Sequence, residues 1–493
     1  MKFFNRSIYL MFLCICWVWP QKGQWISVES KNELTPREEC SMSAAGNHFF
    51  LIGGRGKVPI EGYNPQTKTW APFATPPLEM HHMQALEYHG IILIIGAFTG
   101  NWPNETPIPN IYFYDPLQNK WLQGPLIPTK RLRGSTGLAL YKNKVYMALG
   151  IVDGHTKGWV PWLDSFDPLT GNWEILPDAP RARDHFQTAI YQGKLYALGG
   201  RRSGWEVLNP GENVFTSLEK TDVYDIEKKS WITLPSPSGD MPHPRSGGVV
   251  AVMGNDVVYA GGGNLSNGDL AHSKTHALNT QSLNWRELAN MITGRQVTGG
   301  VLNNSGLYIA SGSGGAGGSP QLKTTEAFYL GEVTQPNLPL LSPGSLKESV
   351  PLKIQANLNE TKTGALKLAH SGGLQAVLVE SISLSQAGKS FQISPDLNFP
   401  LLVAPEQNLN IPVQYTHTGI PATATLQVKL AVPSGAVLNF EISGDVSTPV
   451  YKKTKFRQTR EPQILKVQPS IQIHLDTQPF LIDGKKPTDI KAR

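Results

Sequence analysis

Short stretches of alternating apolar and polar residues recur along the first two thirds of the chain. They come in pairs such as TGLALY and KVYMALG, or FQTAIY and KLYALGG. Each pair is followed by two more stretches that meet at a turn, as in YNPQTKTW (63–70), FYDPLQNKW (113–121) and SFDPLTGNW (165–173). Alternation with a period of two predicts β-strands, and Asn-Pro or Asp-Pro predicts a tight turn. Each unit of about fifty residues therefore predicts a four-stranded antiparallel sheet.

Tryptophan marks the last strand of every unit. The six repeated positions are Trp25, Trp70, Trp121, Trp173, Trp231 and Trp285. Seven positions before each of the last five stands an aromatic or apolar residue: Tyr63, Tyr114, Phe166, Tyr224 and Leu278. A four-stranded sheet cannot bury both of its faces alone, whereas a ring of such sheets can. The repeat predicts an all-β fold, a six-bladed β-propeller over residues 24–332, closed by pairing of residues 24–28 beside residues 324–330.

The repeated double glycine, tyrosine and tryptophan resemble the repeat of the kelch family, which also spans about fifty residues per blade. The resemblance covers residues 24–332 and includes the glycine pairs at Gly53, Gly199 and Gly261. It implies the propeller fold. It leaves the function open, because kelch propellers serve both as binding scaffolds and as enzymes.

Arginine occupies one slot, sixteen residues before the glycine pair or its equivalent, in five of the six units. These residues are Arg37, Arg133, Arg183, Arg245 and Arg295, and the second unit has Met80 instead. We expect the slot to lie just before the innermost strand, at the central channel. Two interpretations stay open. The arginines could bond carbonyls of a neighbouring blade, or they could form an electropositive ring that binds carboxylate or sulfate groups of a ligand.

The residues that follow this slot depart from the repeat in three units. They are Glu38 and Glu39, His81 and His82, and Asp184 and His185. We expect these candidate catalytic residues to share one rim of the channel. Carboxylates beside histidines can perform acid–base chemistry or bind a metal, and they can equally be solvated rim residues or bonds between blades. We assign no metal and no cofactor to the rim at this point.

Three long loops carry tryptophans outside the repeated position. The loops are 99–110, 153–162 and 201–215, and their tryptophans are Trp102, Trp159, Trp162 and Trp205. Aromatic loops beside charged residues are typical of carbohydrate sites, where rings stack on sugar faces. The alternative is that these rings pack as small cores under their own loops. We predict a ligand site at the channel mouth and the loops of blades 2–4.

Two enzyme families resemble this arrangement. Galactose-oxidase-like copper enzymes use a Tyr–Cys crosslink, a second Tyr and two His. Cys40 lies near a channel strand, but His81 and His82 stand where the crosslinking Tyr is expected. The sequence therefore disfavours a copper enzyme of this type. Sialic-acid mutarotases are exported six-bladed kelch propellers that use arginine and carboxylate groups. That resemblance implies Glu38, Arg37, Arg183 and Arg245 as site residues, and it leaves open whether the chain is an enzyme.

The last third of the chain contains a second domain. Residues 333–349 are rich in Pro and Ser and predict a linker. Alternating strands over residues 350–447 predict an immunoglobulin-like β-sandwich, which resembles the ASPM–SPD-2–Hydin type through Phe391, Pro405, Ile411, Val413, Tyr415, Gly419 and Gly444. Residues 448–493 form a basic tail that could add strands to the sandwich.

The N-terminus and the net charge bear on location and partners. Lys2 and Arg6 precede a short apolar run, which predicts an export signal over residues 1–23; an uncleaved membrane anchor is the alternative. The net charge of +6 is small for 493 residues and does not indicate a nucleic-acid partner. We expect an extracellular or periplasmic protein that binds a carbohydrate or an extracellular protein. A mutarotase or epimerase of sugars is the second hypothesis and a protein–protein scaffold the third.

Overall fold

The computed structural model describes residues 22–204, 215–264, 270–385, 390–394, 397–433 and 435–447. Over these residues the chain is all-β, as the sequence predicts. The only helical segments among the described residues are the 3-10 turns η1 (Thr129–Arg131) and η3 (Ala316–Gly318). None of the helices in this part of the chain has the length and apolar character needed to cross a membrane. Most of the predicted export signal, Trp205 and the basic tail lie outside the described residues.

The kelch-like region folds into six four-stranded antiparallel sheets, which we number 1 to 6 along the chain. Sheet 1 contains β2 (Cys40–Ala45), β3 (His48–Gly53), β4 (Glu61–Asn64) and β5 (Thr69–Pro72). Sheet 2 contains β6 (Leu86–Tyr88), β7 (Ile91–Ile94), β10 (Asn110–Asp115) and β11 (Lys120–Leu126). Sheet 3 contains β12 (Gly137–Tyr141), β13 (Lys144–Ala148), β16 (Leu163–Asp167) and β17 (Asn172–Leu176).

The remaining sheets follow the same order. Sheet 4 contains β18 (Thr188–Tyr191), β19 (Lys194–Ala197), β22 (Asp222–Asp225) and β23 (Ser230–Thr233). Sheet 5 contains β24 (Val249–Met253), β25 (Asp256–Ala260), β26 (Thr275–Asn279) and β27 (Trp285–Glu287). Sheet 6 contains β28 (Gly300–Asn303), β29 (Gly306–Ala310), β30 (Thr325–Tyr329) and, from the N-terminus, β1 (Gln24–Ser27).

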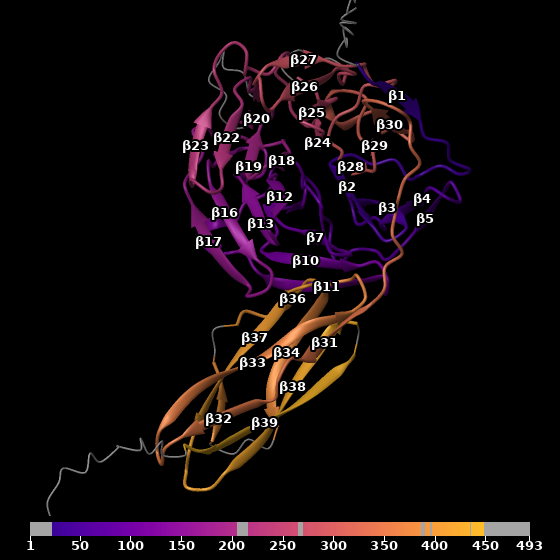
Figure 1. Cartoon of the computed structure of the whole chain (residues 1–493). Helices are drawn as coiled ribbons and strands as arrows, with labels where there is room; N and C mark the ends of the chain where they lie inside the picture. The colour runs from indigo at the N-terminus through magenta and orange to yellow at the C-terminus, as the bar shows by residue number, and fades with distance from the viewer. Residues whose placement is uncertain are drawn as a thin grey trace, which may run out of the picture. The chain divides into compact units, whose positions relative to one another are not determined.

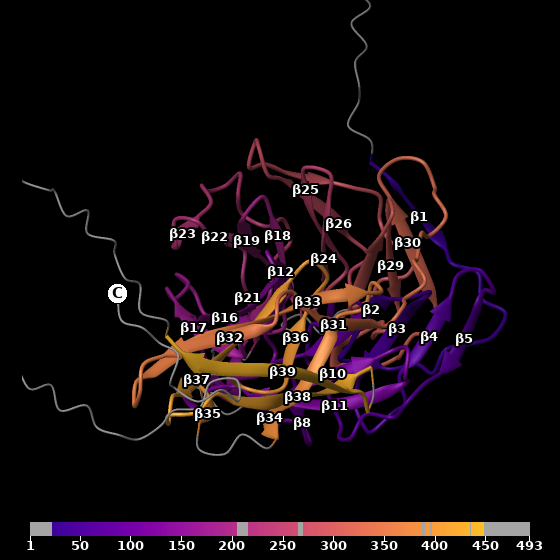
Figure 2. The same cartoon turned by 60° about the horizontal axis from the view of Figure 1, so that its bottom comes forward.

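The sheets close into a ring, which makes this region a β-propeller (Figure 1). The first strand of each sheet contacts the first strand of the next, from β2 through β6, β12, β18 and β24 to β28, and β28 contacts β2 again. Strand β1 lies beside β30 in both views (Figures 1 and 2), and Gln24–Ser27 pair with Tyr329–Glu326 in antiparallel register. The predicted pairing of the N-terminal strand is therefore present. Strand β1 provides the outer strand of sheet 6, whose other three strands come from the C-terminal end of the propeller.

The tryptophan repeat explains how neighbouring sheets are held together. In sheets 1 to 5 each tryptophan pairs with the aromatic or apolar residue seven positions earlier, and the ring centroids of Tyr63 and Trp70 are 5.3 Å apart. Trp25 takes this position in sheet 6, opposite Phe328 at 5.2 Å. Several indoles also donate to a carbonyl just after the last strand of the preceding sheet, as Trp231 Nε1 does to Pro177 O at 2.8 Å. The repeated tryptophan thus buries apolar surface in its own sheet and bonds to the preceding one.

The arginine slot has a structural role that corrects our sequence interpretation. Arg37, Arg133, Arg183, Arg245 and Arg295 are all buried, so they form no ligand-binding ring. Each guanidinium bonds the carbonyl sixteen residues later, as Arg183 Nη1 does to Gly199 O at 2.8 Å. Each also meets a polar side chain on the third strand of its own sheet: Glu61, Asp164, Asp222, His276 and Glu326 respectively. The bonds to a neighbouring blade that we expected from these side chains are made within the blade instead.

Neighbouring sheets are joined at this slot by the main chain. The amide of the second glycine-pair residue donates to the carbonyl of the slot residue in the next sheet. Gly150 N donates to Arg183 O, and Gly200 N to Arg245 O, both at 3.0 Å. Gly312 N donates to Arg37 O at 3.0 Å and so joins sheet 6 to sheet 1. The double glycine therefore matters because its backbone must approach the neighbouring sheet, and a Cβ at Gly261 would stand 2.4 Å from Arg295 O in the next sheet.

His276 gives the propeller a pH-dependent stability, which is our first prediction. Burial, reinforced by the Arg245 guanidinium, lowers the pKa of His276 to about 4. The unfolded chain then binds more protons than the folded chain between that value and about pH 6.5. We expect stability to fall as the pH drops through this window, and His276→Gln to reduce the slope of the urea midpoint against pH. An unchanged slope in the variant would contradict this assignment.

The C-terminal domain consists of two packed sheets. One contains β31 (Gly344–Glu348), β33 (Thr361–Gly372), β37 (Asn408–Thr416) and β35 (Phe391–Ile393). The other contains β32 (Leu352–Ala356), β39 (Val437–Val446), β38 (Ala422–Val432), β34 (Val377–Ser385) and β36 (Leu401–Val403). Four of the residues on which the sequence resemblance rests, Phe391, Ile411, Val413 and Tyr415, are buried between them. Strand β31 pairs with β33, so the predicted linker 333–349 is too long and the domain begins at residue 344.

Candidate functional site at the channel mouth

A cavity of about 470 Å³ lies where the residues after the arginine slot gather. Its wall contains charged residues (Glu38, Glu39, Arg55 and Arg201), histidines (His155 and His185) and aromatic rings (Trp102 and Phe215), and it is completed by Gln296, Val297, Gly317 and Gly318. A concave site of this size, in which charged groups lie beside aromatic surface, can enclose a small polar molecule.

The second residue after the slot has a left-handed backbone in every sheet, and all six of these residues line one small space. The φ angles are 54° for Glu39, 53° for His82, 54° for Ser135, 51° for His185, 66° for Gly247 and 50° for Val297. Five of these six residues are not glycine, and left-handed backbone is strained for side-chain-bearing residues. The repeat thus brings Glu39, His82 and His185 together from three different sheets.

The first residue after the slot anchors the loops of sheets 2, 3 and 4. Each loop begins with an extra two-stranded hairpin: β8 (Phe98–Thr99) with β9 (Thr106–Pro107), β14 (Ile151–Asp153) with β15 (Lys157–Trp159), and β20 (Arg201–Ser203) with β21 (Phe215–Ser217). His81 bridges to Phe98, Gly134 to Ile151 and Asp184 to Arg201 in antiparallel pairs. The hairpins are therefore fixed to the motif by main-chain bonds, and their side chains have defined positions over the channel.

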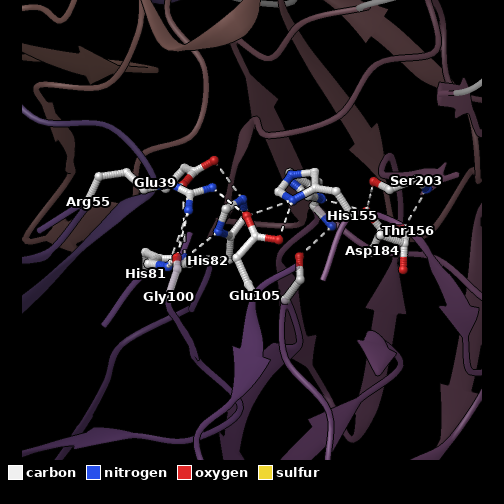
Figure 3. A network of polar contacts seen from close by, with 12 residues as sticks. Glu39, Arg55, His81, His82, Gly100, Glu105, His155, Thr156, Asp184 and Ser203 are labelled. Carbon is white, nitrogen blue, oxygen red and sulfur yellow. Dashed lines mark hydrogen bonds and ion pairs between the residues drawn. The ribbon is translucent and has the colours of Figure 1, made fainter. Parts of the chain in front are cut away.

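These hairpins supply functional residues that the sequence analysis missed. Glu105 follows β8 in the first hairpin, His155 lies in the turn between β14 and β15, and Arg201 and Ser203 belong to β20. His155 fills the place in sheet 3 where the repeat itself offers only Ser135. The sequence contained one sign of His155 as a site residue: it is a histidine in loop 153–162, which we had selected for its tryptophans. Arg55, directly after the Gly53–Gly54 pair, completes the network drawn in Figure 3.

Four side chains converge at the floor of the cavity. One potential ligand atom each from Glu39, His82, His155 and His185 lies within 4.8 Å of the other three. His155 Nε2 is 3.1 Å from His185 Nε2, and His82 Nε2 is 2.7 Å from Glu39 Oε1. All three imidazoles are buried. The predicted rim residues Glu39, His82 and His185 are thus brought together, and Figure 3 shows His82 and His155 pointing toward one another.

Carboxylates behind two of the imidazoles set their tautomers. His155 Nδ1 is 2.9 Å from Glu105 Oε1, and His185 Nδ1 is 2.5 Å from Asp184 Oδ1. A carboxylate accepts, so Nδ1 donates in both rings. Each Nε2 then carries a lone pair, and the two lone pairs face one another. Asp184 is itself held by Ser203, whose N and Oγ donate to it at 2.9 and 2.7 Å.

A chain of bonds sets the third imidazole in the same way. His81 Nε2 lies 3.2 Å from Gly100 O, which can only accept, so His81 donates there and its Nδ1 is an acceptor. His82 Nδ1, 2.7 Å from His81 Nδ1, therefore donates. The lone pair of His82 Nε2 is left to face Glu39. His81, which we predicted as a rim residue, thus lies behind His82 and acts on it as a positioning residue.

Several buried charged groups surround this cluster. Arg55 forms ion pairs with Glu39 and, at 2.6 Å, with Glu105. Arg201 lies 3.8 Å from Asp184. The two guanidinium groups balance the carboxylates of Glu105 and Asp184, which leaves Glu39 and, on the cavity wall, Glu38. A cation beside the three lone-pair nitrogens would favour the ionised form of Glu39.

The pKa shifts agree with neutral imidazoles. Burial lowers the pKa of His185 to about 3 and the pKa of His82 well below its usual value, and burial also lowers the pKa of His155. Burial raises the pKa of Glu39 to about 8, against the opposing charge of Arg55. For Glu105 the bonds from His155 and Arg55 outweigh burial and lower the pKa to about 2. Neutral imidazoles are the form that binds metals.

Of the described loop tryptophans that we predicted as ligand contacts, one lines the cavity and two do not. Trp102 lines the cavity and is 47% exposed, so it is available to a ligand. Trp159 and Trp162 do not line the cavity. Trp162 lies under the guanidinium groups of Arg131 and Arg133, at 4.6 and 5.6 Å from the ring centre, and Trp159 donates to Ser203 O. These two rings contact residues outside their own loops and are not placed to bind a ligand in the cavity.

Comparison with known proteins places the propeller among kelch-repeat sequences. Residues 154–312 match the family described as the KLHDC2/KLHL20/DRC7 Kelch-repeats domain. The chain is 26% identical over 292 residues to Kelch-like protein terF of Aspergillus terreus, which covers 55% of this chain and 61% of that protein. It is 23% identical over 205 residues to Kelch-like protein 40 of Xenopus tropicalis, covering 40% of this chain and 32% of that protein.

A solved structure titled "Structure of YjhT" is 16% identical, with a TM-score of 0.48, and the match covers 61% of this chain and 95% of that chain. The chain spans less than two thirds of the length of both curated relatives named above. The repeat pattern, the ring of sheets, the family match over residues 154–312 and the two kelch-like relatives together support the kelch family for the propeller region.

Proposed function

We propose that this chain is an exported binding protein, a six-bladed kelch propeller closed by its N-terminal strand and followed by an immunoglobulin-like sandwich. Its ligand occupies the cavity at the channel mouth. The observation that carries the proposal is the cavity itself, because it combines an open concave volume with aromatic and ionic side chains from four sheets and their loops. The export signal predicted for residues 1–23 supports an extracellular or periplasmic ligand.

A carbohydrate fits this cavity best. Trp102 offers a half-exposed ring, and Arg201 stacks on Phe215 with its guanidinium carbon 4.7 Å from the ring centre. Aromatic rings bind the apolar faces of sugars, while Glu38 and Arg201 can bond hydroxyl groups. A volume of about 470 Å³ suits a small saccharide. An exposed loop of a protein partner, inserted into the same cavity beside Trp102, is the second candidate.

An enzymatic role on sugars is favoured by one observation and opposed by another. Ionisable groups, Glu38 and His155 among them, line the cavity and could exchange protons with a bound sugar. The arginines that the mutarotase resemblance implies, Arg37, Arg183 and Arg245, are buried and bonded within their sheets, so they cannot contact a sugar carboxylate. We therefore place saccharide binding ahead of mutarotation.

Replacing Trp102 with alanine tests the binding proposal. We expect a saccharide selected on a glycan array to bind about 5- to 30-fold more weakly, because a stacked ring contributes about 1–2 kcal/mol of affinity. Isothermal titration calorimetry measures the change. Trp159→Ala is the matched control, since Trp159 lies in the neighbouring hairpin but outside the cavity wall. Equal affinities in the two variants would place the ligand elsewhere, and an array without hits would favour the protein partner.

A further inference from the structure

We propose that Glu39, His82, His155 and His185 bind one divalent first-row transition metal ion at the floor of the cavity, with one side of the ion open to the cavity. This goes beyond saccharide binding and does not depend on it. It also revises our expectation from the sequence, which assigned no metal and no cofactor to this rim.

The lone pairs of the three imidazoles converge on one point. His82, His155 and His185 each use Nδ1 toward an acceptor behind the ring, so all three Nε2 atoms point their lone pairs into one small space. Glu39 Oε1 faces the same space, 2.7 Å from His82 Nε2. Acceptors that face one another repel unless a proton or a metal ion lies between them. Four such atoms meet here, and one metal ion satisfies all of them.

His82 Nε2 is buried and makes no hydrogen bond of sound geometry among the described residues. Glu39 Oε2 is also inaccessible and lies in an ion pair with the Arg55 guanidinium. His82 is 7% exposed. Buried polar atoms are normally satisfied, and an atom that is not has a function to be explained. A coordinated ion explains His82 Nε2 directly, and it places Glu39 between the ion and Arg55.

A layer of hydrogen-bonded residues behind the histidines fixes the orientation of their rings. Metal-bound histidines characteristically donate their other ring nitrogen to a carboxylate or a carbonyl, which fixes the ring and strengthens the ligand. Glu105 does this for His155, and Asp184 does it for His185. Asp184 is in turn fixed by Ser203 and Arg201. The sequence thus devotes several buried charged residues to orienting two imidazoles, which a solvated rim does not require.

The donor set identifies the class of ion. Three imidazoles and one carboxylate suit zinc, iron, cobalt, nickel or copper, whereas calcium and magnesium prefer oxygen ligands. Adjacent ligands around an ion with bonds of about 2.1 Å are about 3 Å apart in octahedral geometry. The 3.1 Å between His155 Nε2 and His185 Nε2 and the 2.7 Å between His82 Nε2 and Glu39 Oε1 fit this spacing.

The ion would be accessible from one side. Glu39, His155 and His185 line the cavity of about 470 Å³, whereas the channel side of the cluster has a space of only about 40 Å³, lined by His82, Ser135 and Thr298 among others. Protein ligands occupy the floor, so the coordination position toward the cavity is open to water or to a ligand oxygen. Sites with such an open position are typical of metals that act on a bound molecule.

Metal binding to the untagged full chain tests the proposal. The protein is stripped with a chelator, and Zn²⁺ or Co²⁺ is then added; we expect one ion per chain by elemental analysis and visible absorption bands for bound Co²⁺. Both ions should raise the melting temperature, because they bind only the folded chain. A folded chain that binds neither ion, nor Mn²⁺, Fe²⁺, Ni²⁺ or Cu²⁺, would overturn the proposal even if saccharides still bind.

Variants locate the ion. His82→Ala and His185→Ala should reduce the bound metal to less than about a tenth of an ion per chain, and Glu39→Gln, which keeps its shape, should weaken binding at least about tenfold. His243→Ala is the control, because His243 is exposed on the loop before Arg245. Near-ultraviolet circular dichroism reports folding, and if the alanine variants unfold, Glu39→Gln alone decides. Full binding by a folded His82→Ala or Glu39→Gln variant would refute the assignment.

Discussion

Replacing Arg183 with alanine is expected to lower the free energy of unfolding by about 3–5 kcal/mol, the usual effect of removing one partner of a buried ion pair. Arg183 and Asp222 are both fully buried and lie 2.6 Å apart. The guanidinium also donates to Gly199 O at 2.8 Å and to Lys220 O at 3.1 Å. Alanine would remove these donors together and leave a cavity between two strands of sheet 4.

Arg181→Ala is the matched control for this experiment. Arg181 contacts the same carboxylate, Asp222, but its side chain is 27% exposed, so water can replace it. We expect its removal to change the free energy of unfolding by no more than about 1 kcal/mol. Urea unfolding followed by tryptophan fluorescence measures both variants. Similar effects from the two substitutions would show that the repeated slot is not the structural anchor that its geometry indicates.

The fold could be predicted from the sequence because the same local contacts recur in every sheet and fix the spacing of the residues that make them. Trp70 and Tyr63 are directly opposite one another across a tight turn, so their spacing of seven residues follows from strand pairing. The interval of sixteen residues from Arg183 to Gly199 likewise reflects a bond that returns from the side chain to the backbone. Features that satisfy a local geometry in every sheet appear as a period in the sequence, and the pairing of Trp25 with Phe328 could be deduced by completing that period.

The candidate site was only partly predictable, because it is made of departures from the period. Glu39, His82 and His185 could be found, since they occupy one repeated position. Their direction depends on the left-handed backbone at that position, which no residue type at Glu39 or His82 reveals. His155 and Glu105 come from loop hairpins whose placement follows from tertiary pairing. The arginine ring failed as a ligand site for the same reason: spacing located Arg183 but did not tell which way its side chain turns.

Asp184→Asn is expected to weaken metal binding by about 10- to 100-fold, the typical effect of losing a carboxylate behind a metal-bound histidine. Ser203 N donates to Oδ2 and can only donate, so it holds the oxygen of the asparagine side chain there. The NH₂ group then takes the place of Oδ1, beside Ser203 Oγ, which can accept from it, and beside His185 Nδ1. That nitrogen must then accept, so the proton of the imidazole moves to Nε2 and blocks the atom that would bind the ion. Asp184 is thus a positioning residue that acts through His185.

The control for this effect is Gln296→Ala, which changes the equivalent position in sheet 6. Gln296 is buried, donates to Gly315 O at 2.7 Å and lines the same cavity, but it is not one of the four converging side chains. Both variants should lose stability, because each removes a buried hydrogen bond. Only Asp184→Asn should raise the dissociation constant of Co²⁺ and alter its visible spectrum. A structural role for Asp184 alone would lower the unfolding midpoint and leave the spectrum unchanged, so the two measurements together separate orientation of His185 from support of the fold.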